Sequence, residues 1–170
     1  MSTSQIRSNA PAGRLYVRFA MRFIADCMLG KLAKWLRILG YDTLYFHAIS
    51  DDELRNNTLA TGRILLTRDT KLFNRIPSNQ GLFIASDHVA EQLKQVVCAL
   101  HLDCSQQTLT RCLACNAELE RVAKENVECL VPDFIYHTHT DFARCPQCGK
   151  IFWKGSHQAH IKEQLNTLAP

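Results

Sequence analysis

The sequence lacks any apolar run long enough to cross a bilayer. Of its 170 residues, 46% are hydrophobic and 21% are charged, a composition typical of globular proteins, and no stretch approaches the roughly 20 apolar residues of a transmembrane helix. Residues 1–18 contain no acid and no continuous apolar segment, so they do not resemble a secretory signal. We therefore expect a flexible amino-terminal tail over residues 1–18, no membrane partner and a cytoplasmic location.

The cysteines lack the arrangement of a disulfide framework. Four of the eight are scattered singly, and the other four form two Cys-x-x-Cys pairs. Paired motifs of this kind, in a chain without an export signal, predict metal ligands in a reducing compartment. The formal net charge of +4 and the pI of about 8.7 favour an anionic partner without identifying it.

Short apolar runs alternate with amphipathic stretches between residues 19 and 102. We expect strands at 19–25, 43–46, 63–67 and 82–85, and helices at 28–39, 50–60, 70–75 and 89–100. Ser50 and Glu53 predict a capping box at the second helix, and Gly40 and Gly62 follow two helices in the usual position. This alternation predicts an α/β fold whose mostly parallel sheet is flanked by helices. No segment repeats at a fixed period, so a solenoid is disfavoured.

Acidic residues follow all four expected strands. Asp26 ends the first, Asp51 and Asp52 open the helix after the second, and Asp69 and Asp87 stand just past the third and fourth. The carboxyl ends of parallel strands line one ligand-binding crevice. Carboxylates gathered there repel one another unless a cation compensates them, and oxygen ligands suit Mg²⁺ or Mn²⁺. We interpret the five acids as a candidate catalytic set for phosphodiester hydrolysis, with Asp26 and Asp69 as the metal ligands.

Each of these acids also has a structural interpretation. An aspartate after a strand often caps the next helix, and Asp26 and Asp69 stand where such a cap is placed. The capping box alone explains acids at 51 and 52, with Glu53 as the partner of Ser50. The choice between Asp51 and Asp52 as a metal ligand therefore stays open.

Basic residues near the acids are candidate contacts to nucleic acid. Lys31, Lys34 and Arg37 are expected on the helix face opposite the leucines, and Arg68 directly precedes Asp69. All four can reach phosphates beside a metal site. The alternatives are a solvated helix face for the first three and a salt bridge for Arg68.

The two cysteine pairs are the most specific motif. Cys112 with Cys115, and Cys145 with Cys148, flank 29 residues and predict a tetrahedral four-thiolate zinc site. Four thiolates leave no open coordination position, so the zinc is expected to be structural. A redox role is disfavoured because a thioredoxin-like motif needs one pair at a helix start.

A polar segment separates this motif from the preceding α/β pattern. We expect one domain over 19–102, a linker over 103–110, a zinc ribbon over 111–155, and a tail or helix over 156–170. Phe152 and Trp153 stand beside Lys154. We interpret them either as part of the ribbon's core or as aromatic rings that stack on nucleic-acid bases.

The order of these motifs resembles a known family. FIADCMLGKLAKWLRILGYDT, SDDEL, GRILLTRD, ASDHVAEQLKQV, RCLACNAEL and FARCPQCGKIFWKGSH are similar to the PIN-like ribonucleases named for the Mut-seven carboxy-terminal RNAse domain. The resemblance spans residues 23–157. It implies a PIN-type α/β domain with a fused zinc ribbon, cutting RNA with acid-bound divalent metal. The matching acids are Asp26, Asp51 or Asp52, and Asp69, whereas the resemblance says little about Asp87.

We therefore expect a ribonuclease that hydrolyses RNA at an acidic Mg²⁺ or Mn²⁺ site, while the ribbon holds substrate or ribosomal RNA. The alternative is an RNA-binding module of the same fold that has lost catalysis. A toxin-like nuclease controlled by a protein partner is a third, less favoured hypothesis.

Overall fold

The computed structural model describes residues 21–104, 108–153 and 155, so the expected tails at 1–18 and 156–170 lie outside the described residues. Its largest element is a four-stranded sheet of β1 (Arg22–Ala25), β2 (Asp42–Tyr45), β3 (Ile64–Thr67) and β4 (Gly81–Phe83). The strand order is β2-β1-β3-β4 and every pair is parallel. The predicted α/β fold with a parallel sheet is confirmed.

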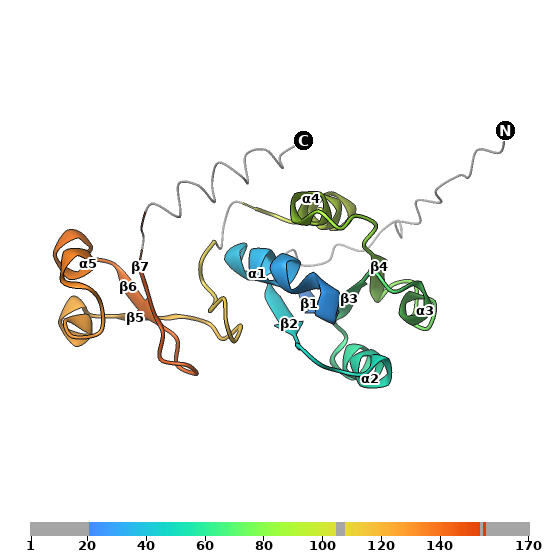
Figure 1. The fold of residues 1–170 in the computed structure, drawn as a ribbon, viewed down its shortest axis with the longest axis horizontal. Helices are drawn as coiled ribbons and strands as arrows, with labels where there is room; N and C mark the ends of the chain where they lie inside the picture. Colours follow the sequence, from blue (N-terminus) through green and yellow to red (C-terminus); the bar gives the residue numbers. More distant parts are fainter. Residues whose placement is uncertain (1–20, 105–107, 154, 156–170) are drawn as a thin grey trace.

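Helices cover both faces of this sheet (Figure 1). The α1 helix (Gly30–Ile38) and the α4 helix (Val89–Leu100) pack on one face, whereas α2 (Asp51–Thr61) and α3 (Thr70–Phe73) pack on the other. The central strand β1 is buried on both sides because successive residues point to opposite faces. Phe23 and Ala25 join the core beneath α1 and α4, and Ile24 joins the core beneath α2 and α3.

The element boundaries follow local chemistry. The α2 helix begins after Ser50 with the predicted capping box, and Gly62 ends it in the left-handed conformation. The helix expected from residue 28 instead opens with a 3₁₀ turn at Cys27–Leu29 before α1. Gly30 follows this turn, and a Cβ there would lie 2.8 Å from the ring of Tyr45. A larger residue at position 30 would therefore require the Tyr45 ring to move.

A second sheet lies beyond residue 110. The strands β5 (Glu120–Val122), β6 (Phe142–Arg144) and β7 (Ile151–Trp153) pair antiparallel in that order; we call them the ribbon sheet. A 3₁₀ turn at Lys124–Val127 and the α5 helix (Asp133–Thr138) belong to the same part of the chain. A small core of Val127, Val131 and Phe142 lies beneath them.

The chain between the two sheets is bound to the four-stranded sheet. The Arg111 guanidinium donates to the Gly40 carbonyl at 3.1 Å, and the Thr43 N–H of β2 donates to Asn116 Oδ1 at 3.0 Å. The second bond satisfies a backbone group of edge strand β2. No helix in the described part of the chain is long and apolar enough to cross a membrane.

Candidate active site and metal centre

The strand connections create one switch point in the four-stranded sheet. The chain leaves β1 through α1 toward β2 on one side, and leaves β3 through α3 toward β4 on the other. Open α/β sheets bind ligands at the carboxyl ends of strands where the connections diverge in this way. Asp26 directly follows β1 and Asp69 stands two residues past β3. The two predicted metal ligands therefore lie at the switch point.

A threonine joins these two acids. The Thr67 side chain is fully buried, and its Oγ1 donates to Asp26 Oδ2 at 2.7 Å and accepts from the Asp69 N–H at 3.0 Å. The Asp26 N–H donates to the Leu66 carbonyl at 3.0 Å. Sequence reasoning did not select Thr67, because a threonine in a buried strand is also explained by its β-branched shape.

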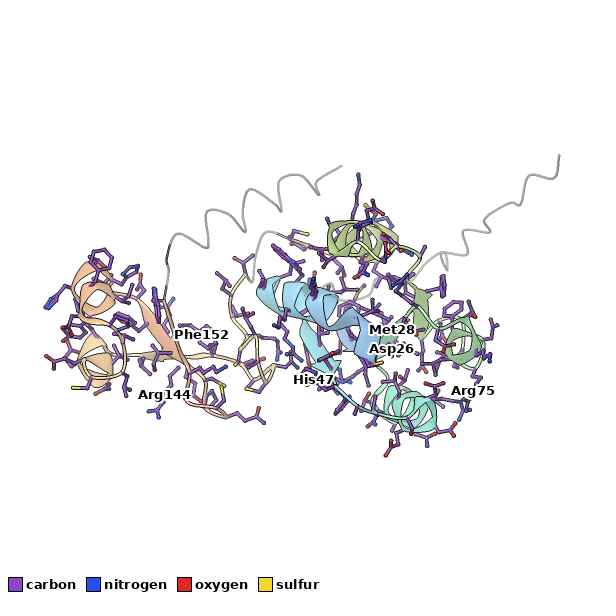
Figure 2. The ribbon with its side chains drawn as sticks, in the orientation of Figure 1. Asp26, Met28, His47, Arg75, Arg144 and Phe152 are labelled. Atoms are coloured by element: carbon purple, nitrogen blue, oxygen red, sulfur yellow. The ribbon has the colours of Figure 1, made fainter. Side chains whose placement is uncertain are left out.

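Both aspartates cap the turns that follow them. Asp26 is 7% exposed, and its Oδ1 accepts from the Cys27 N–H at 2.6 Å (Figure 2). Asp69 Oδ1 accepts from the N–H groups of Lys71 and Leu72 at 2.6 and 3.0 Å. The capping interpretation is correct for both residues. Capping does not use all the acceptor positions of these carboxylates. An ionised carboxylate has about four such positions, and Asp69 Oδ2 bonds to no described residue.

The acids at the start of α2 differ in their partners. Glu53 accepts from the Ser50 backbone N–H and side chain, as the capping box predicts. Asp52 forms an ion pair with Arg75, whose guanidinium hydrogen bond holds the pKa of Asp52 below its ordinary value. Asp51 is exposed and has no hydrogen bond or ion pair with any described residue. Of the three acids in this segment, Asp51 is therefore the one whose carboxylate is not already bonded to another described residue.

The five acids follow the carboxyl ends of the four strands in sequence but do not form a closed cluster. Asp87 is exposed past β4, with an oxygen 3.6 Å from His88 Nε2. In residues 21–104, 108–153 and 155, no acids form a group of three or more ligands within 4.8 Å of one another. A cation at the switch point would take its ligands from Asp26 and Asp69, and the rest from water and substrate.

Three of the four predicted basic contacts are accessible. Lys31 and Lys34 lie exposed on α1, and Arg68 is half-buried. None of the three has an ion-pair partner among the described residues. Their roles as phosphate contacts stay predictions.

The expectation that Arg37 lies on the exposed helix face is wrong. Arg37 is only 4% exposed. Its Nε donates to the Thr43 carbonyl at 3.0 Å, and its Nη1 donates to the carbonyls of Leu113 and Ala114 at 2.9 and 3.0 Å. A segment 76 residues later in the chain covers this end of α1, and helical periodicity carries no information about such a contact.

The four predicted cysteine ligands come together. Their sulfurs all lie within 4.8 Å of one another, with Cys112 and Cys148 at 3.6 Å and Cys115 and Cys145 at 3.3 Å. A tetrahedron with Zn–S bonds of ~2.3 Å has sulfurs about 3.8 Å apart, so the group fits one zinc ion. No other such group of cysteine, histidine or acid side chains occurs in the described part of the chain.

Two thiols of this group have pKa values that move in opposite directions. Burial, together with hydrogen bonds to Cys145 and Cys112, raises the pKa of Cys115 to about 12. Burial also acts to raise the pKa of Cys145, but the backbone N–H groups of Cys148 and Gln147 and the neighbouring thiols lower it to about 7. A bound cation compensates the thiolate charges, so metal binding at this centre releases protons.

The Mut7-C RNAse domain family matches the chain over residues 21–165. Comparison with curated proteins and with solved structures gives no match. The family match takes in the switch-point acids, Thr67 and all four cysteines, and it confirms the resemblance seen in the sequence. With the acid-bearing sheet edge and the four-cysteine centre inside one matched region, the chain belongs to the Mut7-C RNAse domain family.

Proposed function

We propose that this protein is a metal-dependent ribonuclease whose Mg²⁺ or Mn²⁺ site is built on Asp26 and Asp69. The observation that carries the proposal is the hydrogen-bonded series from Asp26 through Thr67 to Asp69 at the switch point. The RNAse description of the family supplies the substrate class.

The available ligands suit a small, hard cation. Mg²⁺ binds through one or two carboxylates, retains several waters and completes its octahedron with substrate phosphate. Asp26 and Asp69 provide that number of carboxylates, and the unbonded Oδ2 of Asp69 faces no competing partner among the described residues. Of the two acids at the start of α2, we propose Asp51 as the additional acid of the metal site, because Arg75 already neutralises Asp52.

Each residue near the proposed metal site has a distinct proposed role. A bound Mg²⁺ or Mn²⁺ would lower the pKa of a coordinated water and stabilise charge on the phosphodiester. Asp26 and Asp69 hold the ion, and Thr67 fixes the rotamer of the Asp26 carboxylate. Lys31 and Arg68 contact phosphates that flank the scissile bond.

The test is RNA cleavage by the zinc-loaded full chain, with Mg²⁺, Mn²⁺ or no added divalent ion. We expect cleavage only with added metal. Asp26→Asn and Asp69→Asn should each lower the rate by roughly a hundredfold or more, since a catalytic ion contributes several kcal/mol. Asp141→Asn removes an exposed acid of the ribbon segment and should leave the rate unchanged. Asp87→Asn in the same assay decides whether the acid past β4 belongs to the site.

The open spacing of the acids favours one alternative, an RNA-binding module without catalysis. It predicts salt-sensitive RNA binding and no cleavage at any concentration of Mg²⁺ or Mn²⁺. Cleavage that survives both Asp→Asn variants would contradict the proposed site, and its source would have to be sought elsewhere.

A further inference from the structure

The two faces of the ribbon sheet differ in chemistry. Strand pairing aligns Val122 with Phe142, and aligns Arg121 with Ala143 and Phe152 in the next cross-strand row. Val122 and Phe142 belong to the ribbon core. Because successive strand residues point to opposite faces, Arg121, Ala143 and Phe152 lie on the face directed away from that core.

This second face is not covered by the ribbon's own helix. Figure 1 shows α5 on the side of the ribbon sheet farther from the four-stranded sheet. Phe152, labelled in Figure 2, is half-buried and belongs to none of the three hydrophobic clusters of the described residues. The small Ala143 separates Phe152 from Arg121, and two strand spacings place their backbones about 10 Å apart. Ala143 contributes only a methyl group to the surface between them.

The charge on this face is positive. Arg121 and Lys150 are both exposed, and neither has an ion-pair partner among the described residues. Lys150 stands two residues before Phe152, on the same side of the hairpin, and its carbonyl accepts from the Cys145 N–H at 2.9 Å. We call Arg121, Ala143, Lys150 and Phe152 the ribbon platform.

The platform is connected to α1, the helix that begins after Asp26, through the four-cysteine centre. Cys145 and Cys148 lie in the turn between β6 and β7, so a metal ion in the four-cysteine centre fixes one end of the platform. The same centre contains the turn whose Leu113 carbonyl is bonded by Arg37 of α1. The opposite end of α1 follows Asp26, and its exposed face carries Lys31 and Lys34.

We propose that the ribbon platform binds single-stranded RNA, with a base stacked on Phe152 and phosphates held by Arg121 and Lys150. The substrate class rests on the proposed ribonuclease function. Single strands are favoured over duplexes because their unpaired bases expose faces that can stack on an aromatic ring. Lys31 and Lys34 are exposed on α1, between Asp26 and the helix end that is bonded to the Cys112–Cys115 turn, so the platform would hold substrate away from the bond that is cut.

Fluorescence anisotropy with a labelled oligouridylate tests the proposal. The strand has about 12 nucleotides, within the roughly 4–16 nucleotides bound by comparable platforms, and the zinc-loaded full chain carries Asp26→Asn to prevent cleavage. We expect Phe152→Ala to weaken binding roughly 5- to 150-fold, the range for loss of one stacked base. Phe152→Trp should restore binding. Arg121→Gln should lower the slope of log K against log salt by about 0.7.

Phe134→Ala is the matched control, because Phe134 is an aromatic residue of α5 that is 73% exposed. It should bind as the parent protein does. Unchanged affinity in both Phe152→Ala and Arg121→Gln would overturn the proposal, as would equal competition by duplex RNA. Zinc content is measured for each variant, and the exposed Arg121 provides a test that does not depend on the packing of Phe152.

The outcomes separate this proposal from the ribonuclease proposal. Platform-dependent binding, without cleavage by the chain that retains Asp26, would contradict only the ribonuclease activity. Metal-dependent cleavage with unchanged binding by the platform variants would contradict only the platform.

Discussion

At the scale of single residues, Thr67 determines how the two switch-point acids are held. Its buried hydroxyl is at once a donor to Asp26 and an acceptor from the Asp69 backbone. Valine has nearly the same shape but can make neither bond, and it would leave the Asp69 N–H without its partner. The hydroxyl would therefore act on the proposed metal site through the carboxylates rather than by direct contact.

We expect Thr67→Val to weaken Mn²⁺ binding by roughly 10- to 100-fold, the usual cost of losing a residue that orients a metal ligand. Thr67→Ser keeps the hydroxyl and should stay close to the parent protein. Isothermal titration with Mn²⁺ of the zinc-loaded protein measures both affinities. Equal affinity in the valine variant would show that the hydroxyl does not support the site.

A second residue-scale effect concerns Asp42 at the start of β2. Arg63 bonds both of its carboxylate oxygens, at 2.7 and 2.9 Å, and Asn116 Nδ2 donates to it at 2.6 Å. Burial acts to raise the pKa of Asp42, but the hydrogen bonds and charge of Arg63, together with Asn116, lower it below the ordinary 3.8. A lowered pKa in the folded state stabilises the fold above the unfolded-state pKa. That contribution is lost as pH falls through the folded-state pKa.

The stability difference between the parent protein and Asp42→Asn should therefore depend on pH. We expect about 1.5–3 kcal/mol, the range for hydrogen bonds to charged groups, at neutral pH. The difference should shrink as pH falls below about 4, near the unfolded-state pKa of aspartate. Urea unfolding of both proteins across this range measures it. A difference that stays constant with pH would rule out this role of the Asp42 carboxylate.

At the scale of elements, the end of α1 and the Cys112–Cys115 turn form one buried contact. Arg37→Met should lower the free energy of unfolding by about 3 kcal/mol or more, because three backbone carbonyls lose charged hydrogen bonds. Lys34→Met, on the exposed face of the same helix, should change it by no more than about 0.5 kcal/mol. Chemical denaturation compares the two variants, and equal effects would contradict the contact.

The elements also show what the sequence could predict. The α4 helix has the predicted limits, and the capping box places the start of α2, because both signals are local. The strands of the ribbon sheet have three residues each, too few to produce a readable period. Arg37 was misplaced because its partners are remote in sequence.

In the candidate site, too, local signals were predictable from the sequence and contacts between remote residues were not. Motif spacing was sufficient to identify the four cysteines, and strand ends were sufficient to place Asp26 and Asp69 on one edge. Thr67 was not identified, because its role depends on the hydrogen bonds between β1 and β3. Asp51 and Asp52 became distinguishable only through Arg75, which belongs to another part of the chain.

At the scale of the whole molecule, the four-cysteine centre joins two sheets. Its Cys112–Cys115 half is bonded to α1, and its Cys145–Cys148 half closes the β6–β7 turn. Cys145→Ser should therefore release zinc and lower the melting temperature. We expect the melting temperature to fall by roughly 5–10 °C. At this chain length each kcal/mol lost from the free energy of unfolding lowers the melting temperature by about 2–4 °C, so this fall corresponds to a loss of a few kcal/mol.

Cys98→Ser is the control for the zinc prediction, because Cys98 is exposed on α4 and lies outside the four-cysteine group. It should keep both zinc and melting temperature. Calorimetry, combined with metal analysis, follows the two variants. Zinc loss with no change in melting temperature would show that the centre does not stabilise the junction.

Anomalous diffraction from a crystal containing Mn²⁺ would show whether Asp26 and Asp69 share one divalent ion. We predict a manganese peak at the carboxyl ends of β1 and β3, bonded to one oxygen of each aspartate. Manganese bound elsewhere would contradict a shared site. So would carboxylates of Asp26 and Asp69 that turn away from each other with manganese present.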